Sequence, residues 1–213
     1  MTKAKDRHAA PGTSGRVLHS AAGYDLLAWL LLLGRERAFR ERLVQLARLE
    51  PGQAVLDVGC GTGSLAIAVK QRVGRSGTVQ GIDASREMIA RARRKASNGG
   101  VDVTFTQGVV EALPFPDRQF DAVLSTLMLH HLPREARNQC ARELRRVLKP
   151  GGRVLAVDFG RATRGRKSLI EHFHRHGGVD VREIIGLLRS AGLEIMESGA
   201  VGVRGMSFVL ATA

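Results

Sequence analysis

Apolar and polar positions along the chain follow two alternating patterns. Short apolar runs bounded by glycine or charged residues are typical of buried strands. Seven such runs are predicted as strands, over residues 54–58, 78–82, 103–106, 120–128, 153–157, 193–201 and 206–211. Apolar residues three or four positions apart instead predict helices. These helices cover residues 64–73, 85–96, 135–148 and 181–190, with one or two more within 24–49.

This order predicts an α/β fold built on a doubly wound, mostly parallel seven-stranded sheet. The last two strands are separated by a short turn, so we expect them to form an antiparallel hairpin at one edge. The run KPGG at 149–152 is expected to end the preceding helix before the strand at 153–157 begins. In such a sheet a ligand binds at the carboxyl ends of the strands.

The composition agrees with one folded domain. The chain has 213 residues, of which 44% are hydrophobic and 25% charged, which excludes a disordered or collagen-like chain. Its two cysteines, Cys60 and Cys140, are too few for a disulfide scaffold and lack metal-ligand spacing. We therefore expect a reduced, cytoplasmic setting.

The charge balance points to an anionic partner. The formal net charge is +13 and the sequence pI is about 11.2, which suits nucleic acid, acidic lipid or an acidic substrate alike. The first twenty residues contain no apolar stretch of signal-peptide length. The apolar run at 26–33 is too short to span a bilayer. A buried helix and a membrane-surface contact both remain open for it.

A glycine-rich turn follows the first predicted strand. Residues 57–64 read DVGCGTGS, and Asp83 stands at the end of the next strand. A carboxylate there can accept hydrogen bonds from both hydroxyls of a ribose, which implies a nucleoside. Ser64 stands where a dinucleotide motif needs glycine, and Asp57 would repel a pyrophosphate. A cationic, phosphate-free nucleoside such as S-adenosylmethionine is favoured over a dinucleotide or a purely structural turn.

Five ordered motifs resemble those of class I S-adenosylmethionine-dependent methyltransferases, in particular the ubiquinone/menaquinone-biosynthesis-like group. They span about residues 24–158 and read VLDVGCGTG at 55–63, GIDAS at 81–85 followed by Met88, EALPF at 111–115, FDAV at 120–123 and LKPGG at 148–152. The resemblance implies a Rossmann-like fold, with S-adenosyl-L-methionine as the cofactor and S-adenosyl-L-homocysteine as the product.

The resemblance also divides the chain. We expect a flexible tail over residues 1–22 and a single methyltransferase domain over 23–213. Within that domain, residues 23–50 would form a helical lid, 51–160 the cofactor-binding core, and 161–213 a C-terminal helix and hairpin.

The same resemblance assigns the cofactor-binding residues. The methionine half would lie against the glycine turn, the ribose hydroxyls on Asp83, and the adenine beside Ala84 and Met88. Tyr24 stands where relatives carry a tyrosine on the lid. The full set is Tyr24, Asp57, Gly59, Cys60, Gly61, Gly63, Asp83, Ala84, Met88, Val109, Val110 and Ser125.

Position 109 departs from the family. Relatives usually carry an acidic residue there, which accepts a hydrogen bond from the adenine amino group, whereas this chain has Val109. The Val110 backbone N–H and packing remain to hold the ring. The loss of one polar contact, about 1 to 2 kcal/mol, predicts weaker cofactor binding.

The residues that follow the fourth strand include two histidines. His130 and His131 are candidate bases, because imidazole titrates near neutral pH and can take a proton from an attacking atom. The alternative is that they only shape the pocket, while positioning does most of the work of an in-line displacement. Asp158, just past the fifth strand, is another candidate for the pocket edge.

No metal site is predicted. His172, His174 and His176 alternate, but no carboxylate or cysteine cluster completes a ligand set. The nearby basic run of Arg161, Arg164, Arg166 and Lys167 is either a solvated face or a contact for an anionic substrate or lipid surface.

The sequence therefore predicts a cytoplasmic methyltransferase that acts on a small-molecule or lipid/quinone-like acceptor, with contact at the inner membrane face. A nucleic-acid methyltransferase is the alternative among enzymes, weakened because seven Phe, one Trp and one Tyr are few for base stacking. A non-catalytic S-adenosylmethionine-binding regulator is the alternative from another class. The acceptor atom and the oligomeric state stay open.

Overall fold

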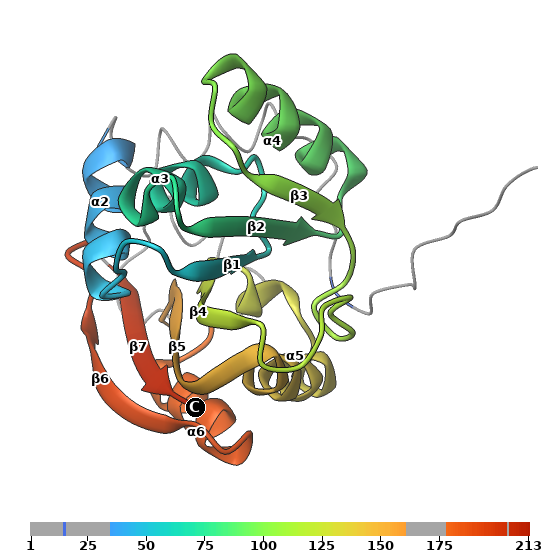
Figure 1. Cartoon of the computed structure of the whole chain (residues 1–213). Helices are drawn as coiled ribbons and strands as arrows, with labels where there is room; N and C mark the ends of the chain where they lie inside the picture. Colours follow the sequence, from blue (N-terminus) through green and yellow to red (C-terminus); the bar gives the residue numbers. More distant parts are fainter. Residues whose placement is uncertain (1–14, 16–34, 161–177, 204) are drawn as a thin grey trace, which may run out of the picture.

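A seven-stranded sheet organises the part of the chain that the computed structural model describes, residues 15, 35–160, 178–203 and 205–213. The strands lie in the order β3-β2-β1-β4-β5-β7-β6 (Figure 1). Their bounds are β1 Ala54–Val58, β2 Thr78–Asp83, β3 Thr104–Gln107, β4 Phe120–Thr126, β5 Leu148–Phe159, β6 Glu194–Ala200 and β7 Met206–Thr212. Strands β1 to β5 are parallel, and β7 runs antiparallel to both β5 and β6. The predicted sheet and its hairpin edge are confirmed.

Helices cover both faces of the sheet (Figure 1). One face packs against α2 (Glu36–Leu46), α3 (Ser64–Val73) and α4 (Arg86–Asn98). The other face packs against α5 (Arg134–Val147) and α6 (Val181–Ser190). Successive strand side chains point to opposite faces, so Val55 joins the first cluster and Leu56 the second. This is why the strands read as nearly continuous apolar runs.

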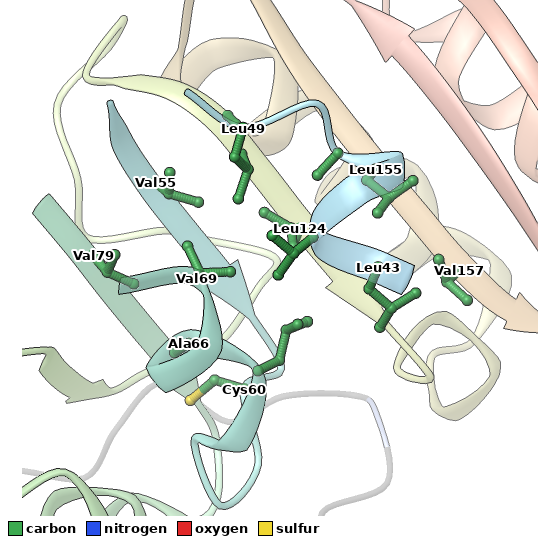
Figure 2. Close-up of a cluster of buried hydrophobic side chains, with 14 of the residues drawn as sticks. Leu43, Leu49, Val55, Cys60, Ala66, Val69, Val79, Leu124, Leu155 and Val157 are labelled. Atoms are coloured by element: carbon green, nitrogen blue, oxygen red, sulfur yellow. The ribbon is translucent and has the colours of Figure 1, made fainter. Parts of the chain in front are cut away.

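The first cluster shows how the layers are held together (Figure 2). Leu43 of α2 and Val69 of α3 lie over Leu124 of β4, and Leu155 of β5 belongs to the same cluster. Each of these side chains is at least 99% buried. Burial of one such aliphatic side chain contributes about 1.5 to 3 kcal/mol. The packing fixes the strand ends, and therefore the residues that follow them.

Strands β4 and β5 differ most from their predicted bounds. Strand β4 ends at Thr126 rather than at residue 128, because Leu127 has a φ of +54° and turns the chain into the 3₁₀ helix Leu129–His131. Strand β5 begins at Leu148 rather than at 153, because Leu148 pairs with Phe120 before a register irregularity. The KPGG run at 149–152 follows the end of α5 as predicted, but it lies inside β5 rather than before it.

Several sequence predictions lie outside the described residues. These are Tyr24, the apolar run at 26–33, the basic run at 161–167 and the histidines His172, His174 and His176. Of the predicted N-terminal helical region, α2 is the part described. Among the described helices, none is long and apolar enough to cross a membrane.

Candidate functional site

The glycine turn leaves β1 at Val58 and is tied to β2. The backbone N–H groups of Gly59 and Cys60 both donate to the Ile82 carbonyl, at 2.8 and 3.0 Å. The N–H of Gly61 donates to Asp83 Oδ2 at 2.9 Å. Gly59, Gly61 and Gly63 have φ values of +68°, +52° and +76°, in the left-handed region that favours glycine. The turn is therefore held at the carboxyl edge of the sheet, where the sequence predicted it.

Glycine at two of these positions also leaves room for side chains from other elements. A Cβ atom on Gly63 would lie 2.6 Å from Phe105 Cζ of β3. A Cβ atom on Gly59 would lie 2.4 Å from Met128 Cγ, in the segment that follows β4. Both distances are far below the carbon–carbon contact optimum of about 3.5 to 4.0 Å. The turn therefore packs directly against the segment that leads to the histidines.

Asp57 is a buried carboxylate beside this turn. It is 2% exposed, and its Oδ2 atom has no hydrogen-bond partner among the described residues. Burial, and then the negative charge of Asp83, raise the pKa of Asp57 to about 8, while a backbone hydrogen bond from Ala66 opposes the rise. A cation placed against Oδ2 would supply the missing partner. The site therefore fits a ligand with an ammonium group, as S-adenosylmethionine has, and disfavours a pyrophosphate.

Asp83 holds the turn and keeps acceptor capacity. Its Oδ1 atom accepts the Ser85 N–H at 2.8 Å, and its Oδ2 atom accepts the Gly61 N–H. Burial raises the pKa of Asp83, and these two backbone hydrogen bonds lower it. Each carboxylate oxygen has a second lone pair, so both oxygens can still accept hydrogen bonds from ribose hydroxyls. Ala84 follows directly, and Met88 is buried in the first turn of α4, where Ser85 Oγ accepts its N–H.

Val109 and Val110 lie at the start of the loop between β3 and β4. The N–H of Gly108 donates to the Asp83 carbonyl at 3.0 Å, so the loop begins beside the end of β2. Val109 is 5% exposed and Val110 is 6% exposed. The wall predicted to meet the adenine is therefore apolar at this point.

The segment after β4 brings His130 to Asp158. His130 Nδ1 lies 2.6 Å from Asp158 Oδ1. Asp158 is fully buried and also accepts the backbone N–H groups of His130, at 3.1 Å, and Phe159, at 2.7 Å. An ionised carboxylate only accepts hydrogen bonds, so this contact favours the tautomer with the proton on Nδ1, in which Nε2 keeps its lone pair. The His131 ring lies 3.9 Å from the His130 ring, centroid to centroid.

Two hydroxyl groups at the end of β4 are also buried. Ser125 Oγ and Thr126 Oγ1 have no hydrogen-bond partner among the described residues. Ser125 was a predicted site residue, whereas Thr126 was not. Strand register places Ser125 between Val58 of β1 and Ala156 of β5, at the same sheet edge as Asp57 and Asp158.

Arg137 of α5 was missed by the sequence analysis. Its Nε atom donates to the carbonyls of Leu129 and Leu132, both at 2.9 Å, on either side of the histidines. Its Nη1 atom donates to Glu183 of α6 at 2.5 Å. No motif marks Arg137, because two of its partners are backbone carbonyls that any sequence supplies and the third, Glu183, is 46 positions away in the chain.

Both cysteines are buried and free. Burial raises the pKa of Cys60 well above its usual value and that of Cys140 to about 12, so both thiols stay protonated. Cys60 lies within the glycine turn. Among the described residues, no group of histidine, cysteine and acidic side chains could hold a metal ion.

Comparison with protein families and curated proteins gives a consistent result. A family model described as "Methyltransferase domain" matches residues 55–152. The chain is 37% identical over 163 residues to the ubiquinone/menaquinone biosynthesis C-methyltransferase UbiE of Xanthomonas campestris, which covers 75% of this chain and 64% of that protein. It is 37% identical over 149 residues to UbiE of Bordetella avium, covering 70% of this chain and 57% of that protein. The chain thus spans about three fifths of the length of these relatives.

Solved structures share the fold. A SAM dependent methyltransferase from Aquifex aeolicus has a TM-score of 0.72 at 24% identity, covering 92% of this chain and 99% of that one. Phosphoethanolamine N-methyltransferase 2 of Haemonchus contortus, in complex with S-adenosyl-L-methionine, has a TM-score of 0.74 at 17% identity, covering 91% of this chain and 57% of that one.

Proposed function

Because the chain carries a methyltransferase domain of the S-adenosylmethionine-dependent class and is related to ubiquinone/menaquinone C-methyltransferases, we propose that it methylates a quinol-like small molecule. The observation that carries the proposal is the unpartnered Oδ2 atom of buried Asp57. A buried carboxylate without a cation is unfavourable unless a ligand supplies one. The ammonium group of S-adenosylmethionine meets that need.

The cofactor would lie along the carboxyl edge of β1 and β2. Asp57 receives the ammonium group, and the glycine turn, including Cys60, lines the methionine chain. Asp83 accepts from the ribose hydroxyls. Ala84, Met88, Val109 and Val110 would surround the adenine, and Ser125 would lie toward the reacting methyl group. Tyr24, predicted for the lid, lies outside the described residues. When bound, S-adenosylmethionine supplies an electrophilic methyl group and leaves as the thioether S-adenosylhomocysteine.

His130 is the proposed base. Asp158 accepts a hydrogen bond from Nδ1–H, with 2.6 Å between Nδ1 and Oδ1, which leaves Nε2 to remove the proton of a quinol hydroxyl. The resulting phenolate makes a neighbouring ring carbon the nucleophile. That carbon would form the new bond to the methyl group that a bound S-adenosylmethionine supplies, and the electron pair of the broken bond would stay on sulfur. The ring C–H proton then moves to the oxygen, so that one proton remains on Nε2.

The quinol acceptor is supported by the names of the relatives, which place them in ubiquinone and menaquinone biosynthesis. We further propose that a long-chain acceptor is reached at an anionic membrane surface, supported by the net charge of +13. Co-sedimentation with vesicles that contain acidic lipid, and none with neutral vesicles, is the expected result. Equal recovery with both vesicle types would contradict it.

The function is tested with methyl-labelled S-adenosylmethionine and a hydroquinone that carries an isoprenoid tail. We expect label in the organic phase with the native chain and little with Asp57→Asn. Labelled nucleic acid in a parallel reaction would instead support the nucleic-acid alternative. Cofactor binding without any labelled product would support the non-catalytic regulator.

A further inference from the structure

The loop over residues 108–119 is fixed at both ends. At its start, the N–H of Gly108 donates to the Asp83 carbonyl beside the proposed ribose site. Val110 and Leu113 then pack into the same buried cluster as Leu56 and Ile82. At its end, Arg118 and Gln119 donate their N–H groups to the carbonyls of residues 146 and 147 of α5, at 2.9 and 2.8 Å. The loop therefore connects the proposed adenine site to the carboxyl end of α5.

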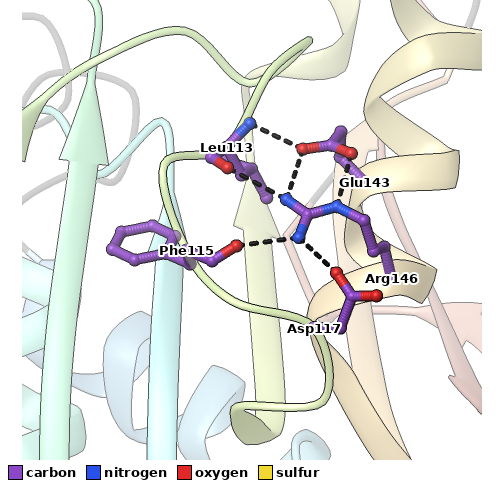
Figure 3. A network of polar contacts seen from close by, with 5 residues as sticks. All are labelled: Leu113, Phe115, Asp117, Glu143 and Arg146. Carbon is purple, nitrogen blue, oxygen red and sulfur yellow. Dashed lines mark hydrogen bonds and ion pairs between the residues drawn. The ribbon is translucent and has the colours of Figure 1, made fainter.

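Arg146 holds the middle of this loop (Figure 3). Its Nη2 atom donates to the Leu113 carbonyl at 2.9 Å, and its Nη1 atom donates to the Phe115 carbonyl at 2.8 Å. Nη1 also contacts Asp117 at 2.8 Å. One planar guanidinium group thus binds the loop at three positions, which a lysine ammonium cannot match in geometry.

Glu143 completes the network on the preceding turn of α5. It accepts two hydrogen bonds from Arg146, at 2.8 and 2.7 Å, and its Oε2 atom also accepts the Leu113 N–H at 2.7 Å. The hydrogen bonds from Arg146 hold the pKa of Glu143 below its usual value. Leu113 is consequently held through both its N–H and its carbonyl.

Neither side chain is on the solvent face of the helix. The exposed fraction of the side chain is 31% for Arg146 and 19% for Glu143. Arg142, four positions earlier, is 61% exposed and lies 3.8 Å from Glu135. The chain therefore contains a control arginine on the same helix that does not contact the loop in any described interaction.

We propose that Arg146, with Glu143, is the positioning residue that sets adenine recognition by fixing the loop that carries Val109 and Val110. The proposal rests on the proposed function, since it assumes that the adenine lies against this loop. The position of this loop matters more here than it would in a chain with an acidic residue at position 109. Without that acidic residue, selection for adenine depends on the position of the Val110 backbone N–H. A side chain can rotate to restore a hydrogen bond after a small shift of the loop, whereas a backbone N–H cannot.

The test compares two ligands, S-adenosylhomocysteine and S-inosylhomocysteine, which differ only on the six-membered part of the base. Dissociation constants are measured by calorimetry for the native chain and for Arg146→Gln, Arg146→Lys and Arg142→Gln. For Arg146→Gln we expect about 10-fold weaker binding of S-adenosylhomocysteine and a clearly smaller loss for the inosyl analogue. Arg146→Lys should behave like Arg146→Gln because it lacks the planar fork. Arg142→Gln should leave both constants unchanged.

Measurements of turnover distinguish a loss of cofactor positioning from a general loss of active enzyme. At saturating cofactor, Arg146→Gln should keep kcat within about two-fold of native while KM for the cofactor rises. If the variant fails to fold, Glu143→Gln provides the same comparison with the arginine retained, with a smaller shift in the same direction. An unchanged ratio of the two dissociation constants in the folded variants would overturn the proposal. A native chain that binds neither ligand would instead overturn the proposed function.

Discussion

Two buried aspartates at the same edge of the sheet differ in how their oxygens are used. Asp158, at the end of β5, accepts hydrogen bonds from His130 and from two backbone N–H groups. Asp57, on β1, is just as buried, yet its Oδ2 atom has no partner among the described residues. One carboxylate is satisfied inside the protein and orients a side chain. The other has an oxygen without a partner in that part of the chain, and we propose that a cation fills this place. Burial alone therefore does not tell a structural aspartate from a ligand-binding one.

The largest expected effect tests whether Asp158 orients His130 as the base. His130→Gln removes the proposed base, so we expect kcat to fall about 100-fold or more, while the dissociation constant of S-adenosylhomocysteine changes little. Steady-state kinetics with a quinol acceptor and calorimetry provide the two readouts. His131→Gln is the matched control, with a much smaller loss of turnover. Equal losses in the two variants would remove the distinction that the Asp158 contact makes.

The Asp57 side of the comparison is tested by Asp57→Asn. The variant keeps the shape of the side chain but cannot carry the negative charge, so cofactor binding should weaken about 100-fold, or about 2.7 kcal/mol. The unliganded variant should be at least as thermally stable as the native chain at pH 8, because no buried charge remains. A variant that binds the cofactor as the native chain does would place the ammonium group elsewhere.

A third change sharpens the comparison at the adenine end. Val109→Asp supplies the acidic residue that relatives carry, and we expect cofactor binding to tighten about 10-fold. Val109 is 5% exposed, so the unliganded variant should melt at a lower temperature than the native chain. Val109→Asn is the control without charge. Binding that tightens little in Val109→Asp would show that the adenine does not meet this position.

The pH dependence of stability tests the same Asp57 carboxyl group without a substitution. The folded chain holds a proton on Asp57 up to about pH 8, whereas the unfolded chain loses it near pH 4. The native state thus binds more protons in this range, and the stability of the unliganded protein falls as pH rises from about 4 to 8, by at most about 1.4 kcal/mol per pH unit. Thermal melts across this range should show the decline.

The same titration links to binding. Because the ammonium group of the cofactor favours the ionised carboxylate, cofactor binding at neutral pH should release a proton. Calorimetry in buffers of different ionisation enthalpy measures that proton. A stability profile equally steep in Asp57→Asn would assign the titration to another group, with Asp83 the nearest such carboxylate.

The sequence predicts the sheet well because each strand is a local pattern. Helices α3 and α6 have the predicted bounds, since their apolar spacing and the flanking glycine and aspartate are all local signals. The end of β4 was missed because Leu127 takes a positive φ, which leucine rarely does and which no residue pattern announces. The start of β5 was missed because Leu148 pairs with Phe120, a contact set by tertiary packing.

The residues of the candidate site that lie in sequence motifs were predictable. The contacts between side chains that are far apart in the sequence were not. Asp57, Asp83 and the glycines lie in ordered motifs. His130 and Asp158 were both singled out, but their contact joins positions 28 residues apart. Arg137 and Arg146 each bind two backbone carbonyls as well as acidic side chains. Backbone carbonyls carry no sequence signal, so the sequence gives no sign of which arginine on α5 is buried against a loop.

The contact between Gly59 and Met128 has a consequence for how this sequence can vary. The space where a side chain at 59 would begin is occupied by the methionine from beyond β4, at 2.4 Å. The two positions therefore share one volume, although one belongs to the cofactor turn and the other to the segment before the histidines. A smaller side chain at 128 would not suffice, because Met128 Cβ would itself lie 2.9 Å from a Cβ atom at 59. A side chain at 59 therefore requires the chain at 128 to shift as well, so we expect the two positions to change together among descendants of this chain. Two halves of one catalytic edge would then evolve as a single unit.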